Sequence, residues 1–320
     1  MKLSNYLTSP EKAAIRDGFG QGLSEAAEHS DLVIGLSADL TESVRMNVFQ
    51  EKFPERFIQV GVAEQNMIGV AAGLSMLGKI PFAASYAVFS PGRTWDQIRV
   101  SVCYSNLNVK IIGGHTGLMV GPDGATHQAL EDIAILRVLP NMTVVVPCDF
   151  EEARKATLAL AKHIGPAYLR TSPRDTLVLT TQETSFTLGK ANTLREGSDA
   201  TIIACGVMVA EALLAADELA RQSISVRVIN MHTIKPLDEA VILKAAQETG
   251  AIITAEEHQV AGGLGSAVAE VLSEQLPTPM TRVGMHDSFG ESGKPAELLQ
   301  KYCLSKIEIM AAVRQSIARK

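Results

Sequence analysis

The sequence predicts an α/β protein of two domains, each a mostly parallel β-sheet with helices on both faces. The chain has 320 residues, which corresponds to about two domains at ~150 residues each. Apolar residues make up 46% and charged residues 20% of the chain, as in globular proteins. Short β-branched runs alternate with longer helical patterns along the chain, and this alternation is typical of parallel sheets.

The first unit contains six expected strands and five expected helices. The strands are apolar, β-branched runs at residues 32–36, 57–60, 81–84, 109–112, 142–146 and 167–170. The helices are longer patterns at about 10–28, 63–78, 92–105, 126–138 and 150–163. Because ligands bind beyond the carboxyl ends of parallel strands, we expect functional residues in the loops that follow these strands.

The second unit begins after a polar stretch at residues 180–184. We place the boundary near residue 185, which gives domains at 1–180 and 190–320. Strands are expected at 200–204, 226–229, 251–254 and 280–283, and helices at about 207–221, 237–248, 263–274 and 305–318. The repeated alternation predicts a second, smaller parallel sheet.

Composition argues against several classes of protein. The formal net charge is −6 and no run of Lys or Arg occurs, which disfavours nucleic-acid binding. No apolar stretch reaches the ~18 residues of a membrane span, and residues 1–6 lack the apolar core of a signal peptide. The four cysteines are scattered, with no Cys-x-x-Cys spacing. This pattern excludes a zinc ribbon and predicts reduced thiols and a cytoplasmic location.

Glu64 follows an expected strand and begins an Ala/Gly-rich helix. The simpler interpretation is that its carboxylate complements the helix dipole, which stabilises by ~0.3–1 kcal/mol. The alternative is a buried carboxylate that bonds to a ring nitrogen of a ligand, and the apolar stretch at 71–74 favours it. Tyr86 and Phe89 follow the next strand, where they can pack in the core or stack on a flat heterocycle.

A glycine-rich segment at 113–128 contains His115, Asp123 and His127. Asp123 can serve a turn, and the His-x7-Asp-x3-His spacing is not typical of a metal site. These residue types suit a loop that binds oxyanions and hydroxyl groups. Arg170 ends the last strand of the first unit. Its guanidinium can bind a phosphate bidentately or pair with a surface carboxylate.

In combination, these segments resemble the transketolase family of thiamine-diphosphate enzymes. The matching stretches are residues 37–40, 61–65, 86–89, 121–128 and 139–142. The resemblance covers nearly the whole chain and corresponds to the pyrimidine-binding domain plus the C-terminal domain. The Gly-Asp-Gly and Asn-Asn motifs of the family's pyrophosphate-binding domain do not occur. The chain is therefore similar to the smaller subunit of a split, two-chain transketolase.

The resemblance implies a thiamine diphosphate site. Glu64 matches the catalytic glutamate that bonds to N1′ of the cofactor's aminopyrimidine and favours the imino tautomer. Phe89 matches the aromatic residue that stacks on the pyrimidine, with Tyr86 beside it. Asp39 falls on an aspartate that lines the cofactor pocket.

The resemblance also implies a substrate site. Asp123 and His127 match the pair that contacts donor hydroxyls near the reacting carbons, and His127 is thereby a candidate catalytic residue. The positions that match the family's site for the distal sugar phosphate are His115, Arg170, Arg16 and Ser43. Neither Arg93 nor His258 receives a definite role.

A transketolase subunit of this kind implies several partners. We expect an N-terminal subunit with the pyrophosphate-binding domain, and a self-dimer of this chain within a heterotetramer. Mg²⁺ or Ca²⁺ is expected to be held by the partner and the diphosphate, with no ligand from this chain. The expected reaction moves a two-carbon ketol unit between phosphorylated sugars. The alternatives are the β subunit of a 2-oxoacid dehydrogenase E1 component and a non-catalytic assembly subunit.

Overall fold

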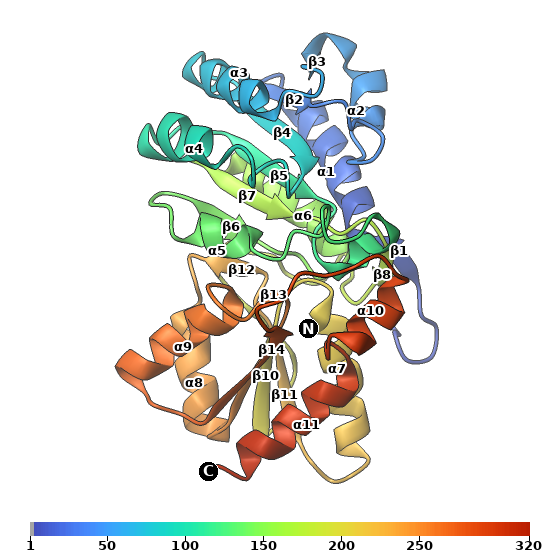
Figure 1. Ribbon diagram of the computed structural model, residues 1–320, viewed down its shortest axis with the longest axis vertical. Helices are drawn as coiled ribbons and strands as arrows, with labels where there is room; N and C mark the ends of the chain where they lie inside the picture. The colour runs from blue at the N-terminus through green and yellow to red at the C-terminus, as the bar shows by residue number, and fades with distance from the viewer. Residues whose placement is uncertain (1–2) are drawn as a thin grey trace.

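The computed structural model describes residues 3–320 and confirms the predicted fold class. Met1 and Lys2 lie outside the described residues. They belong to the stretch at 1–6 that is expected to lack the apolar core of a signal peptide. Two α/β domains are stacked along the long axis of the molecule (Figure 1). The first domain carries the blue-to-green elements and the second the orange-to-red ones.

The first sheet has seven strands in the order β12-β6-β7-β5-β4-β2-β3. Their bounds are β2 (Val33–Ser37), β3 (Phe57–Gln59), β4 (Ile80–Tyr86), β5 (Lys110–Gly114), β6 (Thr143–Val145), β7 (Ala167–Arg170) and β12 (Thr233–Lys235). Neighbouring strands are parallel except β12, which runs antiparallel to β6. Because β12 comes from the second unit of the sequence, this sheet crosses the expected domain boundary.

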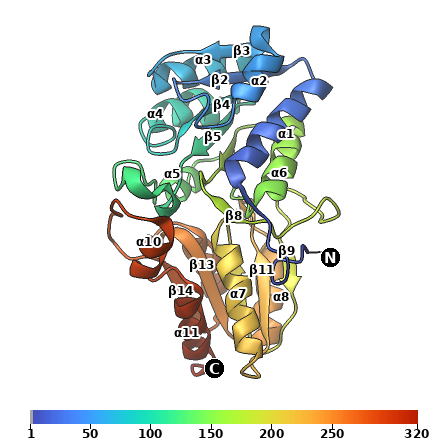
Figure 2. The ribbon, with the colours of Figure 1, turned by 90° about the vertical axis from the view of Figure 1, so that its right-hand side faces the viewer.

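Helices cover both faces of the first sheet. One face carries α1 (Ile15–His29), α2 (Asn47–Lys52) and α6 (Phe150–Lys162). The other carries α3 (Glu64–Met76), α4 (Trp95–Gln97), the π-helix η2 (Ile98–Tyr104) and α5 (Asp132–Arg137). Two short 3₁₀ segments are η1 (Pro54–Arg56) and η3 (Leu118–Asp123). Figure 2 shows α1 and α6 side by side.

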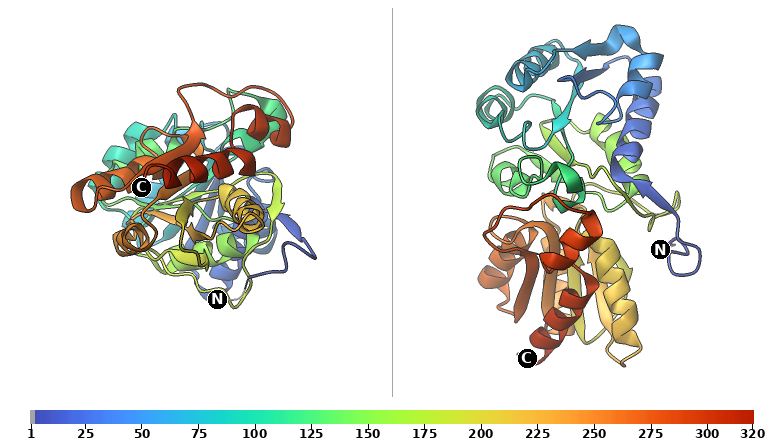
Figure 3. Two further views of the ribbon diagram at one scale, coloured as in Figure 1. Left: turned by 90° about the horizontal axis from the view of Figure 1, so that it is seen from below. Right: turned by 45° about the vertical axis from the view of Figure 1, so that its right-hand side comes forward.

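The second sheet has five strands in the order β14-β13-β10-β11-β9. Their bounds are β9 (Asn192–Arg195), β10 (Ala200–Ala204), β11 (Val226–Asn230), β13 (Ile252–Gln259) and β14 (Met280–Met285), with only β9 antiparallel to its neighbour. One face carries α7 (Met208–Ala220) and α11 (Lys306–Ile317), and the other α8 (Glu239–Thr249) and α9 (Leu264–Gln275). Beside this sheet, α10 (Pro295–Lys301) packs on η3 at the junction of the domains (Figure 3).

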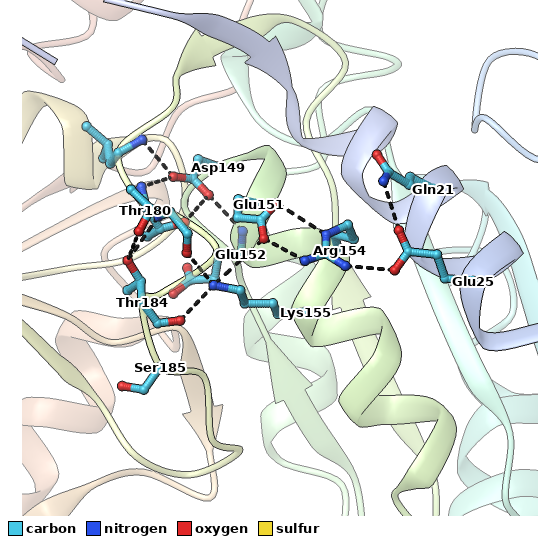
Figure 4. Close-up of polar contacts among 12 residues, drawn as sticks. Gln21, Glu25, Asp149, Glu151, Glu152, Arg154, Lys155, Thr180, Thr184 and Ser185 are labelled. Carbon is cyan, nitrogen blue, oxygen red and sulfur yellow. Dashed lines mark hydrogen bonds and ion pairs between the residues drawn. The ribbon is translucent and has the colours of Figure 1, made fainter. Parts of the chain in front are cut away.

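The segment between the domains is anchored to the start of α6 (Figure 4). Asp149, the N-cap of α6, accepts hydrogen bonds from the backbone N–H of Glu152 at 2.8 Å and of Thr180 at 2.6 Å. Lys155 donates from Nζ to the carbonyl of Thr184 at 2.7 Å. These bonds hold the polar stretch at 180–184 on the first domain.

Two of the expected helices were placed too broadly. Residues 12–14 form the short strand β1 (Lys12–Ala14), which pairs antiparallel with β8 (Asp175–Leu177). Residues 126–131 are not helical, and α5 begins only at Asp132. The reason is that Thr116 pairs with Ala129, which closes the chain between them into a loop instead of a helix.

Candidate active site

Two aromatic and two histidine rings gather where β4 and β5 end. Tyr86, the last residue of β4, stacks on His115 with ring centroids 3.8 Å apart. Its ring lies 5.9 Å from Phe89, and Phe89 meets the edge of His127 at 5.5 Å. The structure thus brings four sequence-predicted site residues into one cluster. A cluster of flat rings offers a stacking surface for a planar heterocycle.

Glu64 lies at the first position of α3 and is only 2% exposed. Its Oε2 accepts a hydrogen bond from Nη1 of Arg93 at 2.9 Å, and the Arg93 guanidinium lies 4.9 Å from the centroid of the Phe89 ring. No hydrogen bond from residues 3–320 reaches Oε1 of Glu64. Glu64 therefore keeps one carboxylate oxygen free to accept a hydrogen bond from a ring nitrogen, and Arg93 links this carboxylate to the aromatic cluster.

His115 is buried against this cluster, and its Nδ1 has no hydrogen-bond partner among the described residues. Burial, together with the charges of Arg16 and Arg174, lowers the pKa of His115 to about 3. The imidazole is therefore neutral near pH 7, and its unpaired nitrogen can bond to a ligand.

We expect the buried neutral His115 to make folding sensitive to acid. Its pKa is 6.5 when unperturbed and about 3 when folded, so between these values the unfolded chain binds more protons. Stability should therefore fall as the pH drops below 6.5, by roughly 1 kcal/mol at pH 5.5. The measurement is thermal or urea unfolding of the wild type and His115→Asn from pH 7.5 to 5. Equal pH slopes for the two proteins would contradict the assignment.

Two arginines lie near His115. Arg16, at the start of α1, donates from Nη1 to the carbonyl of Ser43 at 2.9 Å, and its Nε is buried without a hydrogen-bond partner in residues 3–320. Burial lowers the pKa of Arg16, and the charges of Arg45 and Arg174 add to this effect. The structure thus brings Arg16, Ser43 and His115 to one region.

Arg174 is a residue of this region that sequence reasoning missed. It is exposed, its Nη2 donates to the carbonyl of Val120 at 3.3 Å, and its charge acts on both His115 and Arg16. It also lines a cavity of about 650 Å³ between the domains. The available signal was its position, four residues beyond the end of β7.

Arg170, in contrast, does not face this region. Its Nε donates to Oδ2 of Asp132 at 2.8 Å and its Nη2 to the carbonyl of Glu257 at 2.9 Å. The side chain is 5% exposed. The guanidinium is thus enclosed by protein acceptors, so the geometry contradicts the expectation that Arg170 binds a substrate phosphate.

The remaining candidate residues lie in the same set of loops. Asp39 follows β2, is exposed and has φ of +62°, and its N–H donates to Oε1 of Gln59 at 2.7 Å. Asp123 ends η3 and is exposed. His127 is half-buried, with its Nδ1 2.9 Å from Oγ1 of Thr126. Asp123 and His127 thus belong to the loop that begins at His115.

His258 lies outside this cluster, in the second domain. Its Nδ1 is 2.7 Å from the carbonyl of Gln259, and its Nε2 accepts from the N–H of Ala134 at 3.3 Å. These bonds fix the neutral tautomer with the proton on Nδ1. His258 therefore joins β13 to α5 as a structural residue.

Within residues 3–320, no group of three or more His, Cys, Asp or Glu side chains is arranged to hold a metal ion. In the same range, no helix combines the length and apolar character of a membrane span.

Comparison with protein families places both domains. The family profile of the transketolase pyrimidine-binding domain matches residues 11–177, and that of the transketolase C-terminal domain matches residues 189–309. The two profiles together account for most of the chain. The chain therefore belongs to the transketolase family.

The relatives include subunits of split transketolases. The 6-deoxy-6-sulfo-D-fructose transketolase subunit SqwH of Clostridium sp. (strain MSTE9) is 46% identical over 310 residues, which is 97% of this chain and 96% of that one. An apulose-4-phosphate transketolase subunit of Phocaeicola vulgatus is 40% identical over 294 residues, covering 92% and 94%. A solved structure described as a split gene transketolase, inactive beta4 tetramer, superposes with a TM-score of 0.90 at 46% identity, covering 95% and 98%. The chain is thus similar, over nearly its whole length, to subunits of split transketolases.

Proposed function

We propose that this subunit forms the aminopyrimidine half of a thiamine diphosphate site in a two-chain transketolase. One observation carries the proposal: the buried Glu64 carboxylate keeps Oε1 free, while its Oε2 bonds to Arg93, whose guanidinium lies over the ring of Phe89. A hydrogen-bond acceptor beside a stacking surface suits a planar, nitrogen-containing ring. The two histidines of the same cluster, His115 and His127, would meet the reacting sugar beside that ring, because their rings contact Tyr86 and Phe89.

The residues present fit the cofactor that the family uses. When bound, thiamine diphosphate would supply the carbon nucleophile and the electron sink of ketol transfer. Oε1 of Glu64 would accept a hydrogen bond from the protonated N1′, while Nη1 of Arg93 donates to Oε2. Phe89 would stack on the pyrimidine, with Tyr86 and Asp39 nearby. We assign Mg²⁺ or Ca²⁺ and the diphosphate to the partner subunit.

We propose that the substrates are sugars with a terminal tetrahedral anion. The two relatives are named for a sulfonated sugar and a phosphorylated sugar, and both groups present three oxygens to basic donors. Arg16 and Arg174 supply charge, and neutral His115 supplies a hydrogen bond. Ser43 lies beside Arg16, and Asp123 and His127 would contact the hydroxyls near the reacting carbons. Arg174 replaces Arg170 in this assignment.

Replacing Arg174 with alanine should raise KM for the anionic sugar about 10- to 100-fold, because charge-assisted bonds contribute ~1.5–3 kcal/mol. The measurement is steady-state kinetics of the assembled enzyme with a phosphoketose or sulfoketose and with an uncharged ketose. Arg221→Ala removes an exposed arginine at the end of α7 and serves as the control. An equal loss for charged and uncharged sugars would rule out anion binding by Arg174.

An uncovered apolar surface on α3 and the residues that flank it supports assembly with a second copy of the chain. Val62, Met76 and Leu77 are each more than 70% exposed, at 73%, 75% and 79%. Gly69 and Gly73, one helical turn apart on α3, have no neighbour within 4 Å of a Cβ built on them. A surface of this kind is typical of protein interfaces. We propose that it forms the self-dimer of a heterotetramer with two N-terminal subunits.

The experiment that tests the function is co-expression with a candidate N-terminal subunit. The purified complex would be assayed with phosphoketoses, sulfoketoses and 2-oxoacids, in each case with thiamine diphosphate and Mg²⁺. Transfer of a two-carbon unit from an anionic ketose supports the proposal. Turnover of 2-oxoacids alone would indicate an E1 β subunit, and unchanged activity in a Glu64 variant would indicate a non-catalytic subunit. We propose a cytoplasmic location, because the four cysteines are scattered along the sequence without the spacing of a disulfide framework.

A further inference from the structure

A buried charge cluster joins the two domains behind the active-site loop. It consists of Arg170 at the end of β7, Asp132 at the start of α5 and Glu257 in β13 of the second domain. Arg170 is 5% exposed, Asp132 1% and Glu257 2%. Nε of Arg170 lies 2.8 Å from Oδ2 of Asp132, and Nη1 lies 3.9 Å from Oε2 of Glu257. Burying charged side chains costs desolvation free energy, so a cluster of this kind indicates a structural or functional role.

Arg170 bonds to the base of the active-site loop, which we define as residues 115–129. Its Nη2 donates to the carbonyl of Ala129 at 3.3 Å and to the carbonyl of Glu257 at 2.9 Å. At the same base, the N–H of Gly117 donates to the carbonyl of Ala129 at 2.9 Å. One guanidinium therefore links the closing residues of the loop to the second domain.

Glu257 bonds to the opposite side of the loop. Its Oε1 accepts a hydrogen bond from the N–H of Met119 at 2.6 Å. Gly117 has φ of +69°, and a Cβ at this position would lie 2.1 Å from Cδ of Glu257. The chain thus passes so close to the Glu257 carboxylate that only glycine fits at residue 117.

A second contact from the C-terminal domain supports the same loop. Nε2 of Gln128 donates to the carbonyl of Glu291 at 2.9 Å. At Gly124, a Cβ would lie 2.5 Å from Oγ of Ser292. The active-site loop carries His115, Asp123 and His127, so its position sets where these side chains stand relative to Glu64.

We propose that Arg170, Asp132 and Glu257 form an interdomain clamp that positions the active-site loop, with Glu257 as a positioning residue. The clamp couples the orientation of the second domain to the placement of the substrate-contacting side chains. The contact of these side chains with substrate rests on the proposed function. The restraint of the loop by Glu257 is independent of it, because it follows from the contacts of Met119 and Gly117.

The test uses hydrogen exchange of the full chain, read by mass spectrometry over residues 117–124. In Glu257→Ala, we expect exchange in this segment to quicken at least tenfold, because the acceptor for the Met119 N–H is lost. Glu257→Gln should restore most of the protection, since an amide oxygen can still accept that bond. Unchanged exchange in Glu257→Ala would overturn the clamp.

Glu256→Gln is the matched control. Glu256 is the adjacent, equally buried carboxylate, but it accepts from the N–H groups of Leu264 and Gly265 at the start of α9, both at 2.7 Å. Its replacement should alter exchange at α9 and leave residues 117–124 unchanged. If the Glu256 and Glu257 variants quickened exchange at residues 117–124 equally, the effect would reflect a general loss of stability, and the clamp would be overturned.

A second variant covers the case in which Glu257→Ala fails to fold. Arg170→Lys keeps the charge, but a single ammonium cannot reach both Ala129 and Asp132 as the guanidinium does, so exchange near the loop base should quicken. Protection at the wild-type level would overturn the clamp.

Kinetics of the assembled enzyme separate positioning from catalysis. In Glu257→Ala, KM for the donor sugar should rise about tenfold while the calorimetric Kd of thiamine diphosphate stays unchanged, because Glu64 and Phe89 lie outside the loop. Loss of cofactor affinity without a rise in KM would contradict a role in positioning the loop. If the wild-type complex transferred no ketol unit while the Glu257 variants showed the expected changes in exchange, the proposed function would be rejected and the clamp would remain supported.

Discussion

Replacing Glu64 with glutamine is expected to lower kcat of the assembled enzyme about 10²- to 10⁴-fold, the range typical of a lost acid–base group. The glutamine amide has the same shape as the Glu64 carboxylate, and its oxygen can still accept a hydrogen bond, but it carries no negative charge. Without that charge, the bond at N1′ loses its charge assistance in a site from which water is excluded. The ion pair of Glu64 with Arg93 is lost as well.

The variant should fold, because glutamine fills the same volume at the start of α3. Circular dichroism of the isolated chain and the stoichiometry of the complex check this point. Glu42→Gln, which changes an exposed carboxylate near the same edge of the sheet, is the control. Turnover of Glu64→Gln at the wild-type rate, with partner and cofactor present, would reject the role of Glu64.

Most of the fold could be predicted because strands buried on both faces give uninterrupted apolar runs. The run at 109–112, for example, corresponds to β5 (Lys110–Gly114). The strand β12 could not be predicted, because its three residues carry no periodicity and pair with β6 of the other domain. The non-helical stretch at 126–131 was missed for a related reason. Its conformation depends on the pairing of Thr116 with Ala129, which a local pattern does not reveal.

The candidate site was predictable where a residue's place after a strand decides its position. Tyr86 ends β4 and His115 follows the adjacent parallel strand β5, so both residues lie at the same edge of the sheet, where their rings stack. The same reasoning was misleading for Arg170, which also ends a strand. Its partners Asp132 and Glu257 come from elements 38 and 87 residues away along the chain, and no local signal indicates that both turn toward it. Only the three-dimensional packing separates a binding arginine from a buried one.

The second large effect is expected at Gly18, where α1 crosses α6. A Cβ at this position would lie 2.0 Å from the backbone carbonyl oxygen of Phe150. A backbone atom cannot move aside as a side chain can, so Gly18→Ala should cost about 3 kcal/mol of unfolding free energy. Gly22 faces α6 in the same way, with Arg154 as its neighbour.

The control is Gln21→Ala, an exposed position on the same helix, which should change the unfolding free energy by less than about 0.5 kcal/mol. Urea unfolding of the isolated subunit measures both variants. Because Arg16 lies in the first turn of α1, a helix pushed away from α6 also displaces this arginine from Ser43. We therefore expect Gly18→Ala to raise KM for anionic sugars in the assembled enzyme at temperatures where the variant is folded. A stability equal to that of Gln21→Ala would show that the two helices are not in close backbone contact.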